Sequence, residues 1–280
     1  MNQILKPSID KNDYIECEYC KNKLYRKTID WNIYGTKRVM KLDYERCNCK
    51  DAQKYWNEYD MKKLRKMQEF ANKVDKIIKN SKMSKRNLNY KFDNFEVNSN
   101  NKKVYQSLKN YSEKLVNEVE RKGLILVGNN GVGKTHLACS IANELIKNGI
   151  PIIYGTLINL LAELKNTYDV YNNISEMKII KLYEKVDLLI IDDLGKEKPS
   201  EWGLEKLFTI INSRYENNLP VIITTNYDQK SLINRLSING EIETVKSIIS
   251  RLYEMCYLVK IEDRDHRIKN KKVSNCCSNC

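Results

Sequence analysis

The sequence predicts an α/β protein in which helices cover both faces of a parallel sheet. Two observations predict this class. From residue 92 onward, segments with helical periodicity alternate with short, almost wholly apolar runs of the kind that form buried parallel strands. One of these runs, at 123–127, leads directly into a glycine-rich loop and then a helical pattern, the order that a phosphate-binding loop requires.

The glycine-rich loop at 128–135 reads G-x-x-x-x-G-K-T. Its glycines let the backbone wrap closely around a triphosphate, so that successive N–H groups and a helix N-terminus point at it. Lys134 is expected to reach the β- and γ-phosphates, and the Thr135 hydroxyl to ligate Mg²⁺. His136 is expected to cap or pack beside the loop rather than to catalyse. The residues expected to contact the nucleotide are Gly128, Asn129, Asn130, Gly131, Val132, Gly133, Lys134, Thr135 and His136.

The remaining elements of this part follow from apolar periodicity and its breaks. Helices are expected at 102–121, 135–147, 157–166, 177–185, 201–217, 229–236 and 244–255. Strands are expected at 124–127, 151–154, 186–191, 221–225 and 257–261.

Two of the expected strands end in polar residues that fit a nucleotide site. The run at 188–191 is followed by Asp192 and Asp193, the Walker B pattern, and two acids could otherwise merely cap a strand into a turn at Gly195. After a phosphate-binding loop we assign Asp192 to the Mg²⁺ that bridges the phosphates, and Asp193 to orienting or deprotonating the attacking water. Asn226 follows the strand at 221–225 and could hydrogen-bond the γ-phosphate or the water.

The N-terminal part carries four cysteines in two closely spaced pairs. Cys17-x₂-Cys20 and Cys47-x-Cys49 can present four thiolates to one tetrahedral Zn²⁺. The alternating stretches at 24–29 and 38–42 between them predict short strands of a zinc-ribbon-like module, too small to bury a core unaided. Four reduced buried thiols and an iron–sulfur cluster are the alternative interpretations.

A helix is expected at 51–80, with an apolar stripe through Leu64, Met67, Ala71, Val74 and Ile78 and a basic opposite face. This stripe is expected to pack on the zinc module or on a partner protein. The domains are therefore expected at 1–80, at 92–268 and, as a cysteine-containing tail, at 269–280, with a polar linker at 81–91.

The excess of positive charge is concentrated before residue 92. Residues 1–91 hold 23 basic and 12 acidic side chains, whereas residues 92–280 hold 26 and 24. A basic segment beside a near-neutral domain favours a polyanion or an acidic protein as partner, although a solvated basic helix face is the simpler interpretation. No apolar run is long enough to span a membrane, and the expectation is a cytoplasmic protein without membrane partners. In the tail, Cys276, Cys277 and Cys280 could bind a metal or remain as thiols.

Four strings in this order, G-V-G-K-T-H-L-A, I-I-D-D-L-G, I-I-T-T-N and a late S-R-L, complete the pattern. The chain thereby resembles, over residues 92–268, the AAA+ ATPases of the DnaC/DnaI helicase-loader and IstB-like group. The resemblance implies a P-loop NTPase fold with five parallel strands, with Asn226 as the sensor-1 residue and Arg251 as an arginine finger that acts on a neighbouring subunit's ATP. Arg267 lies about where the group has a late arginine near the phosphates, although the glycine usual upstream of it is absent.

The N-terminal cysteine module also resembles the helicase-binding domain of Gram-positive loaders. The resemblance implies an ATPase, slow and dependent on assembly, that loads a hexameric replicative DNA helicase onto single-stranded DNA, with ATP, Mg²⁺ and Zn²⁺ as cofactors. The alternative is an IstB-like ATPase that assists a transposase on duplex DNA. A replication initiator would need a further DNA-reading domain, and a GTPase would need an N-K-x-D or T-K-x-D tetrapeptide, which is absent after the Walker B strand.

Overall fold

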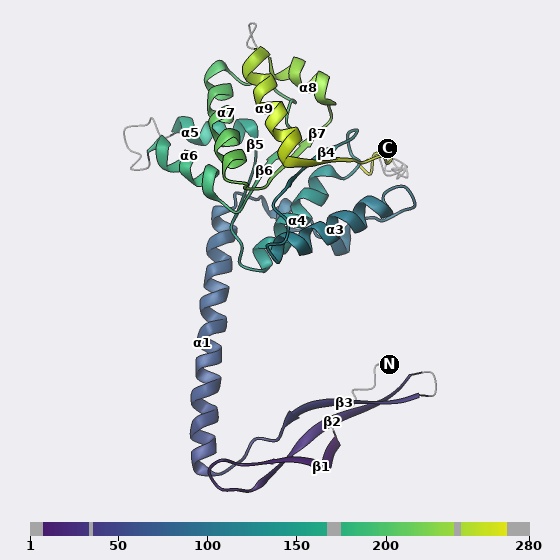
Figure 1. The fold of residues 1–280 in the computed structure, drawn as a ribbon, viewed down its shortest axis with the longest axis vertical. Coiled ribbons are helices and arrows are strands. Elements are labelled where there is room, and N and C mark those ends of the chain that lie inside the picture. The colour runs from purple at the N-terminus through teal and green to yellow at the C-terminus, as the bar shows by residue number, and fades with distance from the viewer. Residues whose placement is uncertain (1–7, 34–35, 167–174, 238–241, 268–280) are drawn as a thin grey trace, which may run out of the picture. The chain divides into compact units, whose positions relative to one another are not determined.

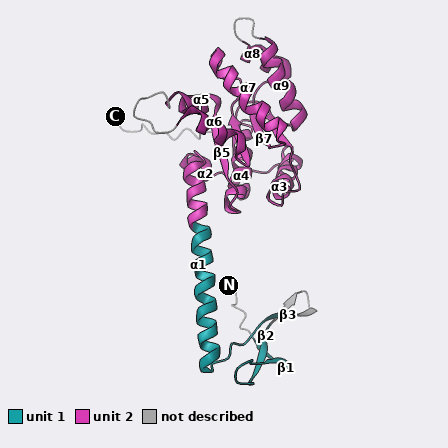
Figure 2. Ribbon diagram, turned by 60° about the vertical axis from the view of Figure 1, so that its left-hand side comes forward, with its two compact units in different colours: residues 1–71 teal, residues 72–280 magenta. Residues whose placement is uncertain are grey.

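The computed structural model describes residues 8–33, 36–166, 175–237 and 242–267 (Figure 1). The chain divides into two compact units, Met1–Ala71 and Asn72–Cys280 (Figure 2). Helix α1 (Lys50–Asn80) begins in the first unit and ends in the second.

The first unit is a three-stranded antiparallel sheet followed by the start of α1. The strands are β1 (Ser8–Glu16), β2 (Lys23–Ile33) and β3 (Thr36–Tyr44), paired in that order. Strand β1 was not expected, because its nine residues contain few apolar side chains and most of them are exposed. Within the described part of this unit the buried apolar cluster is small, comprising Cys17, Cys47 and Ala52.

The second unit contains a five-stranded parallel sheet in the order β5-β6-β7-β4-β8, which confirms the predicted fold class. Four of its strands, β4 to β7, are buried across their central residues, as their continuous apolar composition requires, whereas Tyr257 and Leu258 on the edge strand β8 are exposed. In chain order they are β4 (Gly123–Val127), β5 (Ile152–Thr156), β6 (Leu188–Asp192), β7 (Val221–Thr225) and β8 (Cys256–Lys260).

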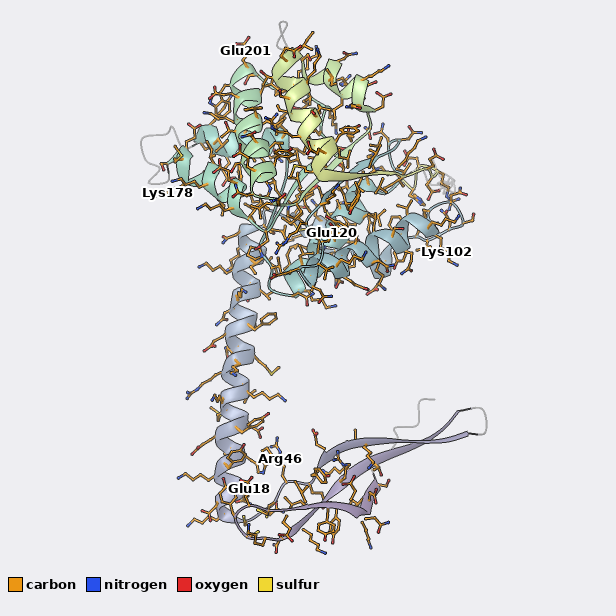
Figure 3. All side chains as sticks on the ribbon, viewed as in Figure 1. Glu18, Arg46, Lys102, Glu120, Lys178 and Glu201 are labelled. Carbon is orange, nitrogen blue, oxygen red and sulfur yellow. The ribbon has the colours of Figure 1, made fainter. Side chains whose placement is uncertain are left out.

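Helices cover both faces of this sheet (Figure 1). One core packs Ile125, Ile191 and Ile223 under helices α5 to α9, and the other packs Leu126, Ile190 and Ile222 under α3, α4 and the end of α1. The helices are α2 (Lys85–Leu88), α3 (Lys102–Val116), α4 (Lys134–Lys147), α5 (Leu157–Lys165), α6 (Glu176–Lys185), α7 (Glu201–Glu216), α8 (Gln229–Leu236) and α9 (Ile242–Met255). Charged side chains such as Lys102, Lys178 and Glu201 lie on the outer surface (Figure 3).

Helix α3 is shorter than the predicted 102–121. It ends at Val116 because Glu118 takes a left-handed conformation, with φ of 57°. The amides of Glu118 and Val119 then donate to the carbonyls of Leu115 and Lys114, the pairing that closes a helix C-terminus.

The predicted polar linker at 81–91 is instead packed into the second unit. Ser81 and Met83 are buried, and α2 occupies part of the segment. The Tyr154 amide on β5 donates to the Ser81 carbonyl at 2.9 Å. The stripe on α1 divides accordingly, since Val74 and Ile78 pack on the core of the second unit whereas Leu64 and Met67 are exposed.

Candidate functional site

The glycine-rich loop connects β4 to α4 and depends on backbone conformations that glycine favours. Gly131 and Gly133 have φ values of 76° and 97°. A Cβ on Gly131 would lie 1.7 Å from Asp265 Oδ1, and one on Gly133 would lie 2.6 Å from the Phe95 ring. Side chains at these positions would therefore both strain the backbone and displace neighbours.

Lys134 is folded back over its own loop. Its Nζ donates to the carbonyls of Gly128 (2.9 Å) and Asn129 (2.7 Å), and the residue is 5% exposed. Burial lowers the pKa of Lys134, and the positive charge of Arg267 adds to this effect. A phosphate would offer the ammonium group a stronger partner than two neutral carbonyls.

Asp192 at the end of β6 is a buried carboxylate that accepts hydrogen bonds from three hydroxyl groups. Thr135 Oγ1 lies 2.9 and 3.1 Å from its two oxygens, Thr224 Oγ1 donates to Oδ1 at 2.6 Å, and the Tyr154 hydroxyl donates to Oδ2 at 2.6 Å. Burial and the nearby Asp192 charge raise the pKa of Tyr154, so its hydroxyl keeps its proton. The pair Thr135 and Asp192 is the oxygen set that an Mg²⁺ ion beside a phosphate requires.

Asp193 follows immediately but lies in a different environment. It takes a left-handed conformation with φ of 55°, and its amide donates to Thr224 Oγ1 at 2.8 Å. Its carboxylate lies 3.6 Å from Lys196 Nζ and lines the cavity above the loop. The two consecutive acids therefore have separate positions, one buried behind Thr135 and one facing the cavity.

This cavity has a volume of about 440 Å³. Its lining includes loop residues, Asp193 and Asn226 from neighbouring strand ends, and Arg267 from the segment after β8. The lining residues are Arg86, Tyr90, Asn130, Gly131, Gly133, Lys134, Thr135, His136, Asp193, Lys196, Asn226, His266 and Arg267. Val132 belongs to the loop, but its side chain is buried in the core below it.

Asn226 joins the carboxyl end of β7 to the loop. Its Nδ2 donates to Asn130 Oδ1 at 2.9 Å, whereas its Oδ1 is buried and has no hydrogen-bond partner among the described residues. An unpaired buried amide oxygen at the wall of the cavity is available to a water molecule or a ligand hydroxyl.

The arginines predicted to act on the nucleotide occupy different places. Arg267 lines the cavity. Arg251 on α9 does not line it: its Nε donates to Asn212 Oδ1 at 2.8 Å, and its guanidinium group lies over the Phe208 ring. Arg251 is therefore placed on the α7–α9 surface, away from the lining of its own chain's cavity.

Two further groups fasten the edges of the loop. His136 Nε2 lies 3.0 Å from the Lys91 carbonyl, and its ring packs against Tyr90, while burial lowers the pKa of His136. Asp263, whose side chain is 1% exposed, accepts hydrogen bonds from Asn98, Asn101 and His266 at 2.6–2.9 Å. The His266 amide in turn donates to the Gly131 carbonyl, so the segment after β8 is held against the loop.

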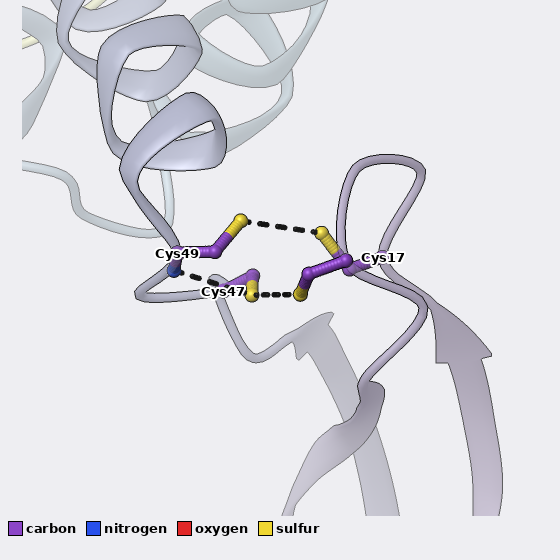
Figure 4. Close-up of side chains that lie close together, drawn as sticks. Cys17, Cys47 and Cys49 are labelled. Atoms are coloured by element: carbon purple, nitrogen blue, oxygen red, sulfur yellow. Dashed lines mark hydrogen bonds between the residues drawn. The ribbon is translucent and has the colours of Figure 1, made fainter.

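In the first unit, the four N-terminal cysteines converge, and Figure 4 shows the side chains of Cys17, Cys47 and Cys49 turned toward one another. All four Sγ atoms lie within 4.8 Å of one another, with Cys20 and Cys47 3.3 Å apart and Cys17 and Cys49 3.9 Å apart. Tetrahedral zinc with Zn–S bonds of about 2.3 Å needs sulfur atoms about 3.8 Å apart. The donor set and its spacing therefore fit Zn²⁺. Cys276, Cys277 and Cys280 lie outside the described residues.

Sequence reasoning missed several residues of the site. Tyr154, Thr224 and His266 touch Asp192 or the loop, and Arg86 and Tyr90 line the cavity from the segment expected to be a linker. The sequence does contain a signal for Tyr154, which lies in an apolar strand next to the Walker B strand. A buried hydroxyl there needs a hydrogen-bond partner, and Asp192 is near enough to supply one.

Comparison with known proteins places this geometry in a family. The family model of IstB-like ATP binding proteins matches residues 51–274, which is most of the chain. The chain belongs to that family.

Relatives of this IstB-like protein extend the comparison. It is 29% identical over 164 residues to the phage-like element PBSX protein XkdC of Bacillus subtilis, covering 56% of each chain. It is 28% identical over 163 residues to the replicative helicase loader DnaC of Buchnera aphidicola, covering 58% of this chain and 65% of that one. The chain thus spans between about half and two thirds of the length of these curated relatives.

Among solved structures, the IstB-like protein matches the crystal structure of DnaI with a TM-score of 0.54 and 26% identity. That match covers 66% of this chain and 94% of the other. The fold is that of an AAA+ P-loop ATPase. In the described part of the chain, no helix combines the length and apolar character that crossing a membrane requires.

Proposed function

We propose that the protein is an ATP-dependent loader of a hexameric replicative DNA helicase onto single-stranded DNA. The observation that carries the proposal is the Thr135–Asp192 pair at the base of a polar cavity built on a phosphate-binding loop. Relatives named as replicative helicase loaders support the helicase as the partner. ATP binding then favours assembly with the helicase and the DNA, and hydrolysis releases the loader.

The residues around the cavity have separate roles in this proposal. Lys134 would exchange its carbonyl partners for the β- and γ-phosphates, and Thr135 and Asp192 would hold Mg²⁺, which would neutralise phosphate charge. Asp193 orients or deprotonates the attacking water, and the free Oδ1 of Asn226 accepts a hydrogen bond from it. Arg267 contributes a positive charge near the phosphates.

Hydrolysis is proposed to require a neighbouring subunit. Arg251 is presented on the α7–α9 surface and does not line its own chain's cavity. An arginine finger supplied by an adjacent copy would complete the site and stabilise transition-state charge. The ATPase would then be slow in the isolated chain and faster in an assembly.

The first unit is proposed to bind the helicase, with its four cysteines holding a structural Zn²⁺ that stabilises the small sheet. The basic segment at 61–91 carries 11 basic and 2 acidic residues, which suits either a DNA backbone or an acidic protein surface.

A loading assay tests the proposal. The purified chain is mixed with the host's replicative helicase, ATP and circular single-stranded DNA coated with single-strand-binding protein, and unwinding of an annealed strand is measured. The chain should raise unwinding strongly, whereas Lys134→Ala, which removes the phosphate contact, should not. Unchanged unwinding and unchanged helicase ATPase activity would contradict the proposal.

A second candidate is an ATPase that assists a transposase on duplex DNA, favoured by the match of the IstB-like family model to residues 51–274. Binding of fluorescent single-stranded and duplex DNA of equal length, with ATP present, separates the two. Preference for single strands supports the loader, and ATP-dependent assembly on the duplex supports the transposition ATPase.

A further inference from the structure

Tyr154 is a buried tyrosine that has no role in the function proposed above. It lies on β5, directly beside β6, and it is 8% exposed. Its hydroxyl donates to Asp192 Oδ2 at 2.6 Å, yet Tyr154 is not among the residues that line the phosphate cavity. The phenol therefore acts on the Walker B carboxylate and not on the nucleotide.

The three hydroxyl groups around Asp192 differ in which part of the carboxylate they contact. Thr224 holds Oδ1 and Tyr154 holds Oδ2, each at 2.6 Å, whereas Thr135 contacts both oxygens at longer distances. Thr135 also lines the cavity, so the carboxylate edge facing Thr135 is the edge that would meet a metal ion. Tyr154 and Thr224 thus hold the carboxylate without occupying that edge.

We propose that Tyr154 is a positioning residue for the metal-binding carboxylate of Asp192, an inference that rests on the proposed ATP and Mg²⁺ site. The terminal torsion of an aspartate is soft, so one hydroxyl on Oδ1 does not fix the carboxylate plane. The Tyr154 hydroxyl fixes the second oxygen, which leaves Asp192 already oriented when Mg²⁺ enters. Removal of such outer partners typically lowers metal affinity or activity about 10–100-fold.

The test is Tyr154→Phe in the full chain, which removes one oxygen and keeps the ring in the core. Binding of a fluorescent ATP analogue is measured in EDTA and across an Mg²⁺ titration. In EDTA the variant should bind as the wild type does, because Lys134 and the loop are intact. The Mg²⁺ concentration for half-maximal enhancement should rise about 10-fold, and excess Mg²⁺ should restore hydrolysis.

Tyr111→Phe is the matched control, since the Tyr111 hydroxyl is also buried but donates to the Lys122 carbonyl at 2.7 Å. It should keep the wild-type Mg²⁺ response. If Tyr154→Phe folds poorly, Thr224→Val removes the donor to the other oxygen, together with the acceptor of the Asp193 amide, and should shift the same titration in the same direction.

A wild-type Mg²⁺ response in Tyr154→Phe, or an equal shift in Tyr111→Phe, would overturn the inference and leave the proposed function standing. A wild-type protein that binds no nucleotide would overturn the proposed function and this inference with it.

Discussion

Asp192 and Asp193 show how two adjacent carboxylates come to serve different purposes. Asp192 is 6% exposed and held by hydroxyl groups, whereas Asp193 faces the cavity because its φ of 55° turns the chain there. The left-handed region of φ/ψ space is sparsely populated by non-glycine residues. Holding such a residue there costs about 1–3 kcal/mol, and residues of this kind cluster at functional sites. The strained backbone at Asp193 supports its proposed role at the attacking water.

Asp193→Asn should therefore retain ATP binding and lose hydrolysis. Asparagine is nearly isosteric and tolerates the left-handed conformation, but it cannot accept a proton. The hydrolysis rate should fall about 10²–10⁴-fold, with nucleotide affinity unchanged in equilibrium binding. Glu113→Gln, an exposed carboxylate on α3, serves as the control. A variant that hydrolyses ATP at the wild-type rate would exclude Asp193 as the base.

At the residue scale, sequence alone predicts the groups that a continuous motif contains, such as Lys134, Thr135 and Asp192. It does not predict partners that meet only through strand register. Tyr154 and Thr224 lie 38 and 32 positions from Asp192, and only the parallel pairing of β5, β6 and β7 brings their hydroxyl groups to it.

At the scale of elements, the five parallel strands were predictable to within two residues, because each is a short apolar run bounded by polar residues. The failures have physical causes. Strand β1 presents mostly polar, exposed side chains, so the alternation of apolar and polar residues that predicts a strand is weak there. The end of α3 depends on the left-handed conformation of Glu118, and glutamate is not a residue type that predicts this conformation. The polar composition of 81–91 conceals the burial of Ser81 and Met83.

The segment after β8 should release at low pH. Burial raises the pKa of Asp263, but hydrogen bonds from His266, Asn98 and Asn101 outweigh it and lower the pKa to about 2 from the ordinary 3.8. A depressed folded-state pKa contributes stability above about pH 4, and this is lost as pH falls towards 2. The contribution is about 2 kcal/mol.

Urea unfolding of the full chain between pH 5 and pH 2 measures this contribution. Asp263→Asn cannot titrate, so its free energy of unfolding should be lower at pH 5 and should fall less between those limits. Parallel pH curves for the variant and the wild type would contradict the assignment.

The small sheet of the first unit should depend on the proposed Zn²⁺. Its described buried apolar cluster contains only Cys17, Cys47 and Ala52, so burial alone stabilises it weakly. Elemental analysis should find one zinc per chain, and a strong chelator should remove it together with the β signal of this unit in circular dichroism. Nucleotide binding should survive, since it resides in the second unit. A metal-free sheet that stays folded would contradict the zinc site.

At the scale of the whole molecule, one chain supplies the loop, Asp193, Asn226 and Arg267 to its cavity, with Asp192 behind Thr135, but not Arg251. Arg251→Ala should leave ATP affinity unchanged and lower assembly-dependent hydrolysis by about 10³-fold or more. Arg121→Ala, an exposed arginine before β4, should leave both unchanged. Retained hydrolysis in assembled Arg251→Ala would contradict a shared site.

Mixing variants sharpens this test. A Lys134→Ala chain keeps its arginine but cannot hold ATP, and an Arg251→Ala chain holds ATP but lacks the arginine. If the site is shared, mixed assemblies should hydrolyse ATP although each variant alone does not. If Arg251 acts within its own chain, the mixture should be as inactive as its components.

Because the Tyr154 amide donates to the Ser81 carbonyl, hydrogen exchange at that amide reports on the position of the Ser81 segment. Strand β5 is at the edge of its sheet, and this N–H reaches across to the buried segment that follows α1. Deuterium would replace its hydrogen slowly while Ser81 stays in place and quickly once the segment departs. The same residue holds the Walker B carboxylate through its side chain. Deuterium uptake at this one backbone position would thus report whether residues 81–83 detach when nucleotide binds.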